Sequence, residues 1–174
     1  MEFQMTPTKV GVGIVVALAT MIGLGFAADT VALPGTSYSM VLPGTPDCAT
    51  ETLSIPGVVE VPASCTVILD GLEYTFDYML LPIEVPNDQA EGAMFGAAMG
   101  HAVGMGGELA DKRVGTVDGF PSMDFVIKTE NSEIIGYSRL VIVGSHLVRV
   151  SIDTAGGRMT KKSAKKIFKS LTID

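Results

Sequence analysis

The chain has 174 residues, a formal net charge of −7 and two cysteines. This length is enough for one domain with a proper hydrophobic core. Residues 28–157 hold 17 acidic and 5 basic residues, whereas residues 158–174 hold 6 basic and 1 acidic. The acidic body excludes a nucleic-acid-binding protein, because a phosphate backbone requires a basic face.

The first segment has the layout of an export signal. Lys9 precedes an uncharged apolar run over residues 10–26, and Gly25 and Ala27 place small side chains at the expected cleavage point. We predict a signal peptide over residues 1–27 that is removed after Ala27. The alternative is an uncleaved membrane anchor, since the run is only a little shorter than a comfortable span. In both cases the rest of the chain is predicted to be extracytoplasmic, either periplasmic or secreted.

The first part of the exported chain is predicted to form a short tether and then a strand. The tether covers residues 28–37, and the strand covers residues 38–42. Pro56-Gly57 lies midway between Cys48 and Cys65 and predicts a hairpin that places the two cysteines on facing strands. In an oxidising compartment a disulfide bond between them would persist. Two buried free thiols are the alternative.

A second hairpin and a helix are predicted next. Asp70-Gly71 is a favoured turn between strands over residues 66–69 and 72–81. After a proline-bounded linker, a helix is expected to begin near Asn87, whose side chain can cap it. We expect this helix to continue to about Leu109.

The second half of the chain is predicted to consist mainly of strands, over residues 113–117, 123–129, 133–143 and 147–153. Residues 140–143 are all apolar, which indicates a central strand covered on both faces. A final helix is predicted where Ala164, Ile167, Phe168 and Leu171 recur at helical spacing. The order strands, helix, strands, helix predicts the α+β class, with an antiparallel sheet and helices packed on its faces.

Four short motifs resemble those of PsbP-like envelope proteins. They are a strand with Pro-Gly-x-Pro at residues 38–46, a Gly-x-Pro step at residues 119–124, paired strands around a glycine turn at residues 139–149, and a Phe-x-Ser-Leu helix end at residues 168–171. The resemblance implies a single domain over residues 38–174 with an α/β/α sandwich. It also implies a binding or accessory module, and it transfers no active-site residue.

The middle helix carries a row of glycines, Gly92, Gly96, Gly100 and Gly104, in a stretch that lacks charged side chains. Four interior glycines cost a helix about 4 kcal/mol relative to alanine, so a compensating contact is expected. Close packing of the helix on its own sheet is the first interpretation. A glycine zipper for self-association or membrane contact is the second, and a partly unfolded segment is the third.

Candidate chemistry on this helix is limited to His101 and Met105, which lie one turn apart and together could ligate Cu(I). The alternative is a core stripe that contains adaptable methionines, and no cofactor or metal is assigned. Ser145 and His146 point to opposite faces of a strand and cannot form a nucleophile–base pair. We therefore expect a protein that is not an enzyme.

The final helix presents five lysines around its apolar stripe: Lys161, Lys162, Lys165, Lys166 and Lys169. A solvated outer face is the first interpretation, and attraction to anionic lipid headgroups or an acidic partner is the alternative. The sequence predicts an exported binding or accessory domain of the cell envelope, with a protein or small-molecule partner that it does not identify. The competing function is a membrane-associated or self-assembling protein that uses the glycine helix, and a copper carrier is a third.

Overall fold

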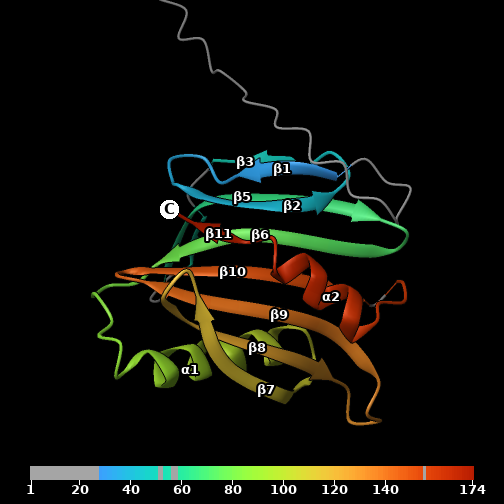
Figure 1. Cartoon of the computed structure of the whole chain (residues 1–174). Coiled ribbons are helices and arrows are strands. Elements are labelled where there is room, and N and C mark those ends of the chain that lie inside the picture. The colour runs from blue at the N-terminus through green and yellow to red at the C-terminus, as the bar shows by residue number, and fades with distance from the viewer. Residues whose placement is uncertain (1–27, 51–52, 56–58, 155) are drawn as a thin grey trace, which may run out of the picture.

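A computed structural model of the chain describes residues 28–50, 53–55, 59–154 and 156–174. These residues form two helices and eleven strands (Figure 1). The helices are α1 (Ala90–Gly104) and α2 (Lys161–Phe168). The strands are β1 (Ala28–Ala32), β2 (Tyr38–Pro43), β3 (Asp47–Ala49), β4 (Leu53–Ile55), β5 (Val59–Leu69), β6 (Leu72–Leu80), β7 (Glu108–Val117), β8 (Phe120–Lys128), β9 (Ile134–Val143), β10 (His146–Asp153) and β11 (Thr172–Ile173).

An eight-stranded antiparallel sheet is the frame of the fold. Its strands follow the order β3-β5-β6-β10-β9-β8-β7, and β4 pairs with β5 beside this path. A separate three-stranded sheet has the order β1-β2-β11. Figure 1 shows this small sheet beside β5 and β6, at the opposite end of the large sheet from β7 and β8.

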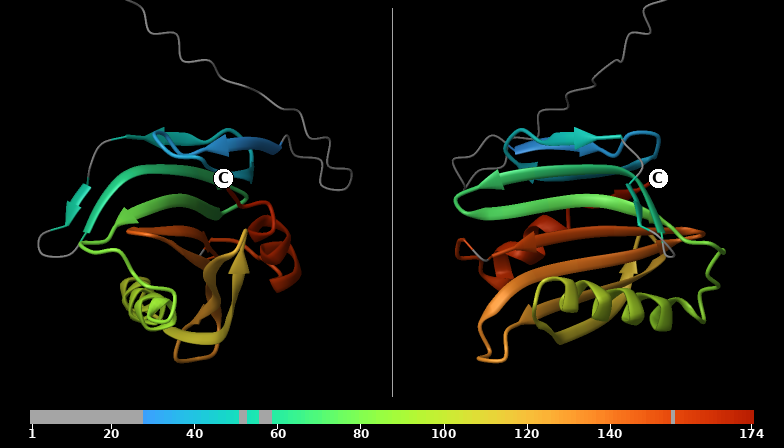
Figure 2. Two further views of the ribbon diagram at one scale, coloured as in Figure 1. Left: turned by 60° about the vertical axis from the view of Figure 1, so that its left-hand side comes forward. Right: turned by 180° about the vertical axis from the view of Figure 1, so that it is seen from behind.

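Each face of the large sheet has its own hydrophobic core. On one face α1 packs against β7, β8 and β9, and Met94 is fully buried there. On the other face the small sheet and α2 cover a larger cluster that includes Phe76 and Val148. Figure 2 shows the two helices on opposite sides of the sheet. The predicted arrangement therefore holds in part: a helix covers one face, but the second face is shared by α2 and a small sheet.

Strand β9 shows why both faces must be covered. Leu140 and Ile142 belong to the core under α1, whereas Val141 between them belongs to the opposite core. All three side chains are at most 2% exposed. The predicted central strand, apolar on both sides, is confirmed.

Two-residue turns set the register of the hairpins, as predicted. The turn Asp70-Gly71 has φ values of 52° and 73°, both in the left-handed region. This is the type I′ geometry, whose twist matches that of the paired strands. In the β9–β10 hairpin, Val143 pairs with His146 across Gly144-Ser145.

The predicted disulfide is present between Cys48 on β3 and Cys65 on β5. The two residues face each other in the β3–β5 register, and β4 continues the pairing with β5 further along the hairpin. The predicted turn at Pro56-Gly57 lies outside the described residues. The side chain of Cys65 is fully buried, so the bond joins an outer strand to the core of the second face.

The prediction of a tether over residues 28–37 is wrong for its first half. Residues 28–32 form β1, which pairs antiparallel with β2 from Ala28↔Pro43 to Ala32↔Ser39. Val31 and Leu33 are buried in the core of the second face, and burying them compensates for ordering the segment. Residues 28–33 are therefore part of the folded domain, ahead of Tyr38.

Helix α1 is shorter at both ends than predicted. Its N-cap is Gln89 rather than Asn87, and no side chain caps it. At the other end Gly106 has a φ of 74°, and the Gly107 N–H donates to the Ala102 carbonyl at 2.9 Å. This is the Schellman arrangement that ends a helix. Of the residues expected to extend the helix, Glu108 and Leu109 instead begin β7.

Neither helix in the described part of the chain is long and apolar enough to cross a membrane. The predicted signal or anchor over residues 1–27 lies outside that part.

The double variant Cys48→Ser/Cys65→Ser should be about 3 kcal/mol less stable to urea than the wild type, because the bond closes a loop of 17 residues in the unfolded chain. The wild type under reducing conditions is the control and should approach the variant. Equal unfolding midpoints for the oxidised wild type and the variant would show that the bond contributes nothing.

Candidate functional site

Helix α2 is the element around which the hollows of the second face are arranged. Its N-terminus is capped by Thr160, whose Oγ1 accepts a hydrogen bond from the Ser163 N–H at 3.1 Å. Ala164 and Phe168 are buried against the sheet, as their helical spacing predicted. The helix therefore presents one flank to the small sheet and the other flank to β7 and β8.

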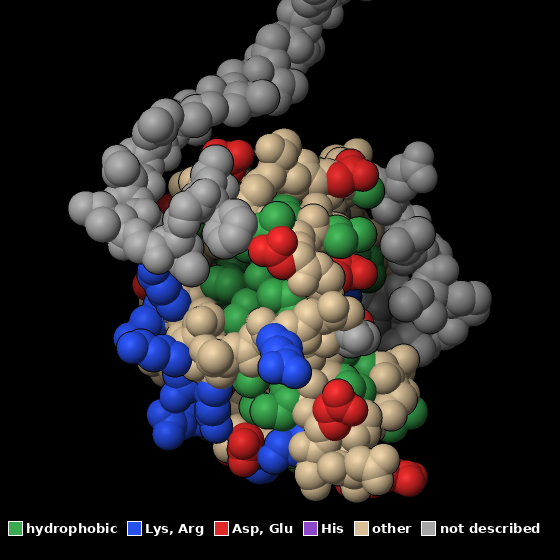
Figure 3. All heavy atoms as spheres, turned by 90° about the vertical axis from the view of Figure 1, so that its right-hand side faces the viewer, with side chains coloured by type: hydrophobic (Ala, Val, Ile, Leu, Met, Phe, Trp, Pro, Cys, Tyr) green, Lys and Arg blue, Asp and Glu red, His purple; other side chains and the backbone are tan. Residues whose placement is uncertain are grey.

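The flank toward the small sheet borders a hollow of about 280 Å³ that we call the apolar groove. Its walls come from β1 and β2, from the β5–β6 turn, and from α2 with the segment before it. Figure 3 shows hydrophobic side chains in a hollow of this side of the molecule, with basic side chains next to them. The lining residues are Ala28, Val41, Pro43, Leu69, Asp70, Leu72, Tyr74, Arg158, Met159, Ser163, Lys166, Ile167 and Ser170.

Backbone contact fixes one end of the apolar groove. A Cβ on Gly71 would lie 2.2 Å from the Gly156 carbonyl oxygen, and a Cβ on Gly156 would lie 2.7 Å from the Gly71 oxygen. Both distances are too short for any side chain, so only glycine allows the β5–β6 turn to meet the segment before α2. The spacing of these two walls is therefore set by main-chain atoms.

Charge at the rim of the groove is mostly positive. Arg158 and Lys166 line it, and neither forms a salt bridge within the described part of the chain. Asp70 is the one acidic residue among the described residues that line it. Burial raises the pKa of the Tyr74 hydroxyl, and the Asp70 carboxylate adds to the shift, so this hydroxyl stays neutral. The groove can therefore accept an apolar body with an anionic end.

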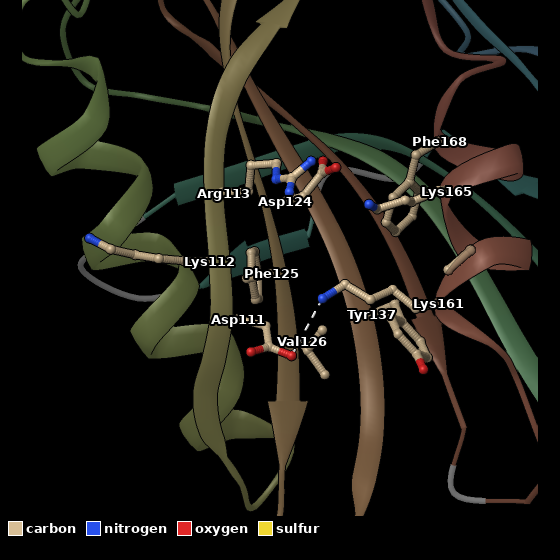
Figure 4. Close-up of a pocket in the computed structure, with 11 residues that line it drawn as sticks. Asp111, Lys112, Arg113, Asp124, Phe125, Val126, Tyr137, Lys161, Lys165 and Phe168 are labelled. Atoms are coloured by element: carbon tan, nitrogen blue, oxygen red, sulfur yellow. Dashed lines mark hydrogen bonds and ion pairs between the residues drawn. The ribbon is translucent and has the colours of Figure 1, made fainter.

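The other flank of α2 borders a second hollow, of about 200 Å³, that we call the cationic cavity (Figure 4). Charged residues on its rim come from the β7 bulge and from α2. The bulge, between Ala110 and Arg113 in the β7–β8 register, has a φ of 50° at Asp111. Its lining residues are Asp111, Lys112, Arg113, Asp124, Phe125, Val126, Tyr137, Lys161, Ala164, Lys165 and Phe168.

The five lysines of the predicted basic helix lie in different surroundings in the structure. Lys166 lines the apolar groove, whereas Lys161 and Lys165 line the cationic cavity. Lys162 and Lys169 are exposed and line neither hollow. The five lysines therefore do not act as one uniform face.

Among the described residues, the most deeply buried ionisable side chain lies under α1, on the first face of the sheet. Asp77 on β6 is 1% exposed and is the direct neighbour of Arg149 on β10. The Arg149 guanidinium donates to both carboxylate oxygens, and its Nη1 also lies 3.3 Å from Nδ1 of His101 on α1. Burial raises the pKa of Asp77, against the lowering effect of Arg149.

His101 is held neutral by this network. Burial lowers the pKa of His101 to about 4, and the Arg149 charge adds to the shift while Asp153 opposes it. Because a guanidinium can only donate, Nδ1 of His101 is the acceptor and Nε2 carries the hydrogen. The network therefore ties α1 to β6 and β10 through a neutral imidazole.

This geometry argues against a copper site at His101 and Met105, which the sequence left open as an alternative. A Cu(I) ion at Nδ1 would displace the Arg149 contact and lie beside a guanidinium. Met105 packs into the core under α1, where its Cε would lie 2.9 Å from a Cβ placed on Gly136. Within the described residues no cluster of three His, Cys, Asp or Glu side chains could hold a metal. The alternative interpretation, a core stripe, fits these contacts.

The first interpretation of the glycine row is wrong. α1 packs on the sheet through Ala90, Met94, Ala98 and Ala102, whereas Gly92, Gly96, Gly100 and Gly104 are exposed. A Cβ at any of the four glycines would meet nothing within 4 Å. The glycines are therefore not needed for packing within this chain. Apolar positions surround this helix, so the spacing alone could not tell which side is buried.

Sequence reasoning missed the polar contact that anchors α2. Arg139 on β9 holds Asp124 on β8 through two hydrogen bonds, Nε to Oδ1 at 2.6 Å and Nη2 to Oδ2 at 3.0 Å. Its Nη1 donates to the Phe168 carbonyl at the end of α2, at 2.7 Å. The available signal was one arginine in an otherwise uncharged strand, with one aspartate in the strand before it.

The architecture is similar to the PsbP-like fold, as the short motifs predicted. The chain is similar to the solution structure of cyanobacterial PsbP (CyanoP) from Synechocystis sp. PCC 6803, with a TM-score of 0.55 and 12% sequence identity. The likeness covers 91% of this chain and 98% of that chain. At this identity it shows the fold alone. No protein-family model and no curated protein sequence matches the chain.

The stability of the wild type should fall as the pH drops from about 6.5 toward 4, because the unfolded chain protonates His101 in this range and the folded chain does not. The expected loss due to His101 is on the order of 2 kcal/mol by pH 4.5. Urea unfolding of the wild type and of His101→Gln at several pH values measures it. The variant retains Asp77, Asp153 and Arg149, so their titration cancels in the difference. If the free energies of unfolding of the two proteins changed with pH in parallel, His101 would not be the group responsible for the loss.

Proposed function

We propose that the protein is a non-enzymatic binding module of the cell envelope, outside the cytoplasm, and that the apolar groove is its ligand site. The proposed ligand class is a short apolar chain that ends in an anionic group. The observation that carries the proposal is the combination of an apolar lining with Arg158 and Lys166 at the rim, neither of them in a salt bridge within the described residues. Such hollows, mostly apolar with a few placed polar groups, are typical of small-molecule sites.

Two features support a location outside the cytoplasm. The pattern over residues 1–27 is that of an export signal. The Cys48–Cys65 disulfide is of a kind that persists in oxidising compartments and is rare in the cytosol.

The contacts of the two histidines, and those of Asp77 and Asp124, support a binding role rather than an enzymatic one. Nδ1 of His101 accepts from Arg149, and Nδ1 of His146 lies 2.7 Å from the Tyr38 hydroxyl. Asp77 and Asp124 are each held by an arginine through both carboxylate oxygens. Groups committed in this way stabilise the fold and are not poised to attack or protonate a substrate.

The groove predicts binding of fatty acids that depends on both chain length and rim charge. Octanoate should bind the full chain more tightly than hexanoate, because each buried methylene contributes up to about 0.8 kcal/mol. Lys166→Glu should weaken octanoate binding about tenfold, since it reverses a charge at the rim. Isothermal titration calorimetry measures both effects.

Lys162→Glu is the matched control, because Lys162 lies on the same helix but lines neither hollow. It should leave the affinity for octanoate unchanged. An equal loss of octanoate affinity in Lys166→Glu and Lys162→Glu would show that the helix charge attracts the anion in general. An affinity that does not depend on the chain length of the fatty acid would exclude the apolar groove as the site.

The outer face of α1 favours a second candidate function, self-association. Phe95, Met99 and Val103 are 40%, 42% and 69% exposed and form a ridge with a spacing of four residues. The exposed glycine row, Gly92 to Gly104, forms a groove of the same spacing beside it. Rows with this spacing on two helices can interdigitate, so two copies related by a two-fold axis could place each ridge in the other's groove.

Replacing glycines on this face separates the folding of one chain from its association. Gly96→Ala and Gly100→Ala should each stabilise the monomer by about 1 kcal/mol, because alanine favours the helix and its Cβ meets nothing within 4 Å. In a dimer that packs through the two glycine rows, the same methyl groups would keep the two helices apart. Size-exclusion chromatography with light scattering should then show a dimer for the wild type and a monomer for Gly96→Leu/Gly100→Leu. A monomeric wild type at high concentration would remove this candidate.

A further inference from the structure

The cationic cavity is built on a row of three charges that crosses three strands. Arg113 on β7 is directly opposite Asp124 on β8, and Asp124 is directly opposite Arg139 on β9. Residues that pair across neighbouring strands lie on the same face of a sheet, so the three side chains share the face that α2 covers. One carboxylate therefore lies between two guanidinium groups.

This carboxylate is already committed to one of its two neighbours. Asp124 accepts from Nε and Nη2 of Arg139 through its two oxygens, in a bidentate pair whose side chains are only 21% and 14% exposed. Arg139 uses its remaining nitrogen to hold the Phe168 carbonyl. Arg113 is left without a salt bridge among the described residues.

The other basic residues of the cavity can be sorted in the same way. Lys112 pairs with Glu91 and lies over the Phe95 ring, and Figure 4 shows it pointing away from the cavity. Lys161 lies 3.4 Å from Asp111, as the dashed line in Figure 4 marks. Lys165 extends from α2 toward the sheet and has no salt bridge within the described part of the chain. Two cations from opposite walls, Arg113 and Lys165, are therefore available.

The remaining walls of the cavity are apolar or aromatic. Val126 and Tyr137 come from the sheet, and Ala164 and Phe168 come from α2. Burial raises the pKa of the Tyr137 hydroxyl, which donates to the Met159 carbonyl at 3.3 Å and so stays neutral. The site therefore combines two available cations, Arg113 and Lys165, with a compact apolar wall that is about as large as one aromatic ring.

We propose that the cationic cavity binds a small organic oxyanion, with its carboxylate or phosphate group between Arg113 and Lys165 and its apolar body against Tyr137 and Phe168. A guanidinium fork suits two oxygens of one anion, and an ammonium adds a point charge from the other side. The cavity of about 200 Å³ limits the apolar body to about the size of one ring. This site is separate from the apolar groove, since α2 lies between them and no residue lines both.

Titration calorimetry of the full chain with phenyl phosphate, benzoate and inorganic phosphate tests the proposal. The two ring compounds carry both the charge and the apolar body, whereas inorganic phosphate carries only the charge. Phenyl phosphate should bind at least about tenfold more tightly than inorganic phosphate, because its ring is buried against the apolar wall. Equal affinities for phenyl phosphate and inorganic phosphate would overturn the assignment of an organic ligand, and no binding of either ring compound would overturn the site.

Neutral variants of similar size locate the bound anion. Arg113→Gln and Lys165→Gln should each weaken phenyl phosphate binding about tenfold, a loss of about 1.4 kcal/mol. Lys162→Gln, on the outer side of the same helix, should leave it unchanged. If Lys162→Gln weakened phenyl phosphate binding as much as Lys165→Gln does, the anion would be attracted only by the overall charge of the helix. A loss in Lys166→Glu without one in Arg113→Gln would place the probe in the groove. Either of these two results would overturn the proposal.

Discussion

The need to bury both sides of the central strands governs this structure. In β9 the neighbours Leu140 and Val141 belong to different cores, so neither face of the large sheet can be left to solvent. The chain meets this requirement with different elements on the two sides. α1 covers one face, and the small sheet together with α2 covers the other. The hollows beside α2 exist because a short helix and a three-stranded sheet do not close over the second face completely.

Polar groups are buried in this fold where they hold a covering element in place. Arg149 ties α1 to the sheet through His101, and Arg139 ties the end of α2 to the sheet through the Phe168 carbonyl. Each arginine is balanced by one aspartate on a neighbouring strand. Because the cost of removing two charges from water offsets much of their mutual attraction, these contacts fix position more than they add net stability. The Arg139 contact also commits Asp124 and so leaves Arg113 open.

Local patterns in the sequence predicted most of the strands, their turns, the disulfide and the two faces of β9. They failed where the outcome depends on distant contacts. Residues 28–32 have little pattern of their own, and they become a strand because β2 offers an edge for pairing. The glycine helix is apolar all round, so its buried side is decided by the sheet beneath it. Both hollows bring together residues far apart in the chain, such as Asp111 and Lys161, and no local motif encodes such a meeting.

The backbone contact between Gly71 and Gly156 has a consequence for how the sequence of this protein can evolve. The distance between two walls of the apolar groove depends on main-chain atoms, whereas the chemistry of the groove depends on side chains that those atoms do not constrain. Substitutions at lining positions such as Val41 or Met159 would therefore change the chemistry of the proposed ligand site while the spacing of these two walls is kept. The lining of such a hollow can diversify while the scaffold around it is kept.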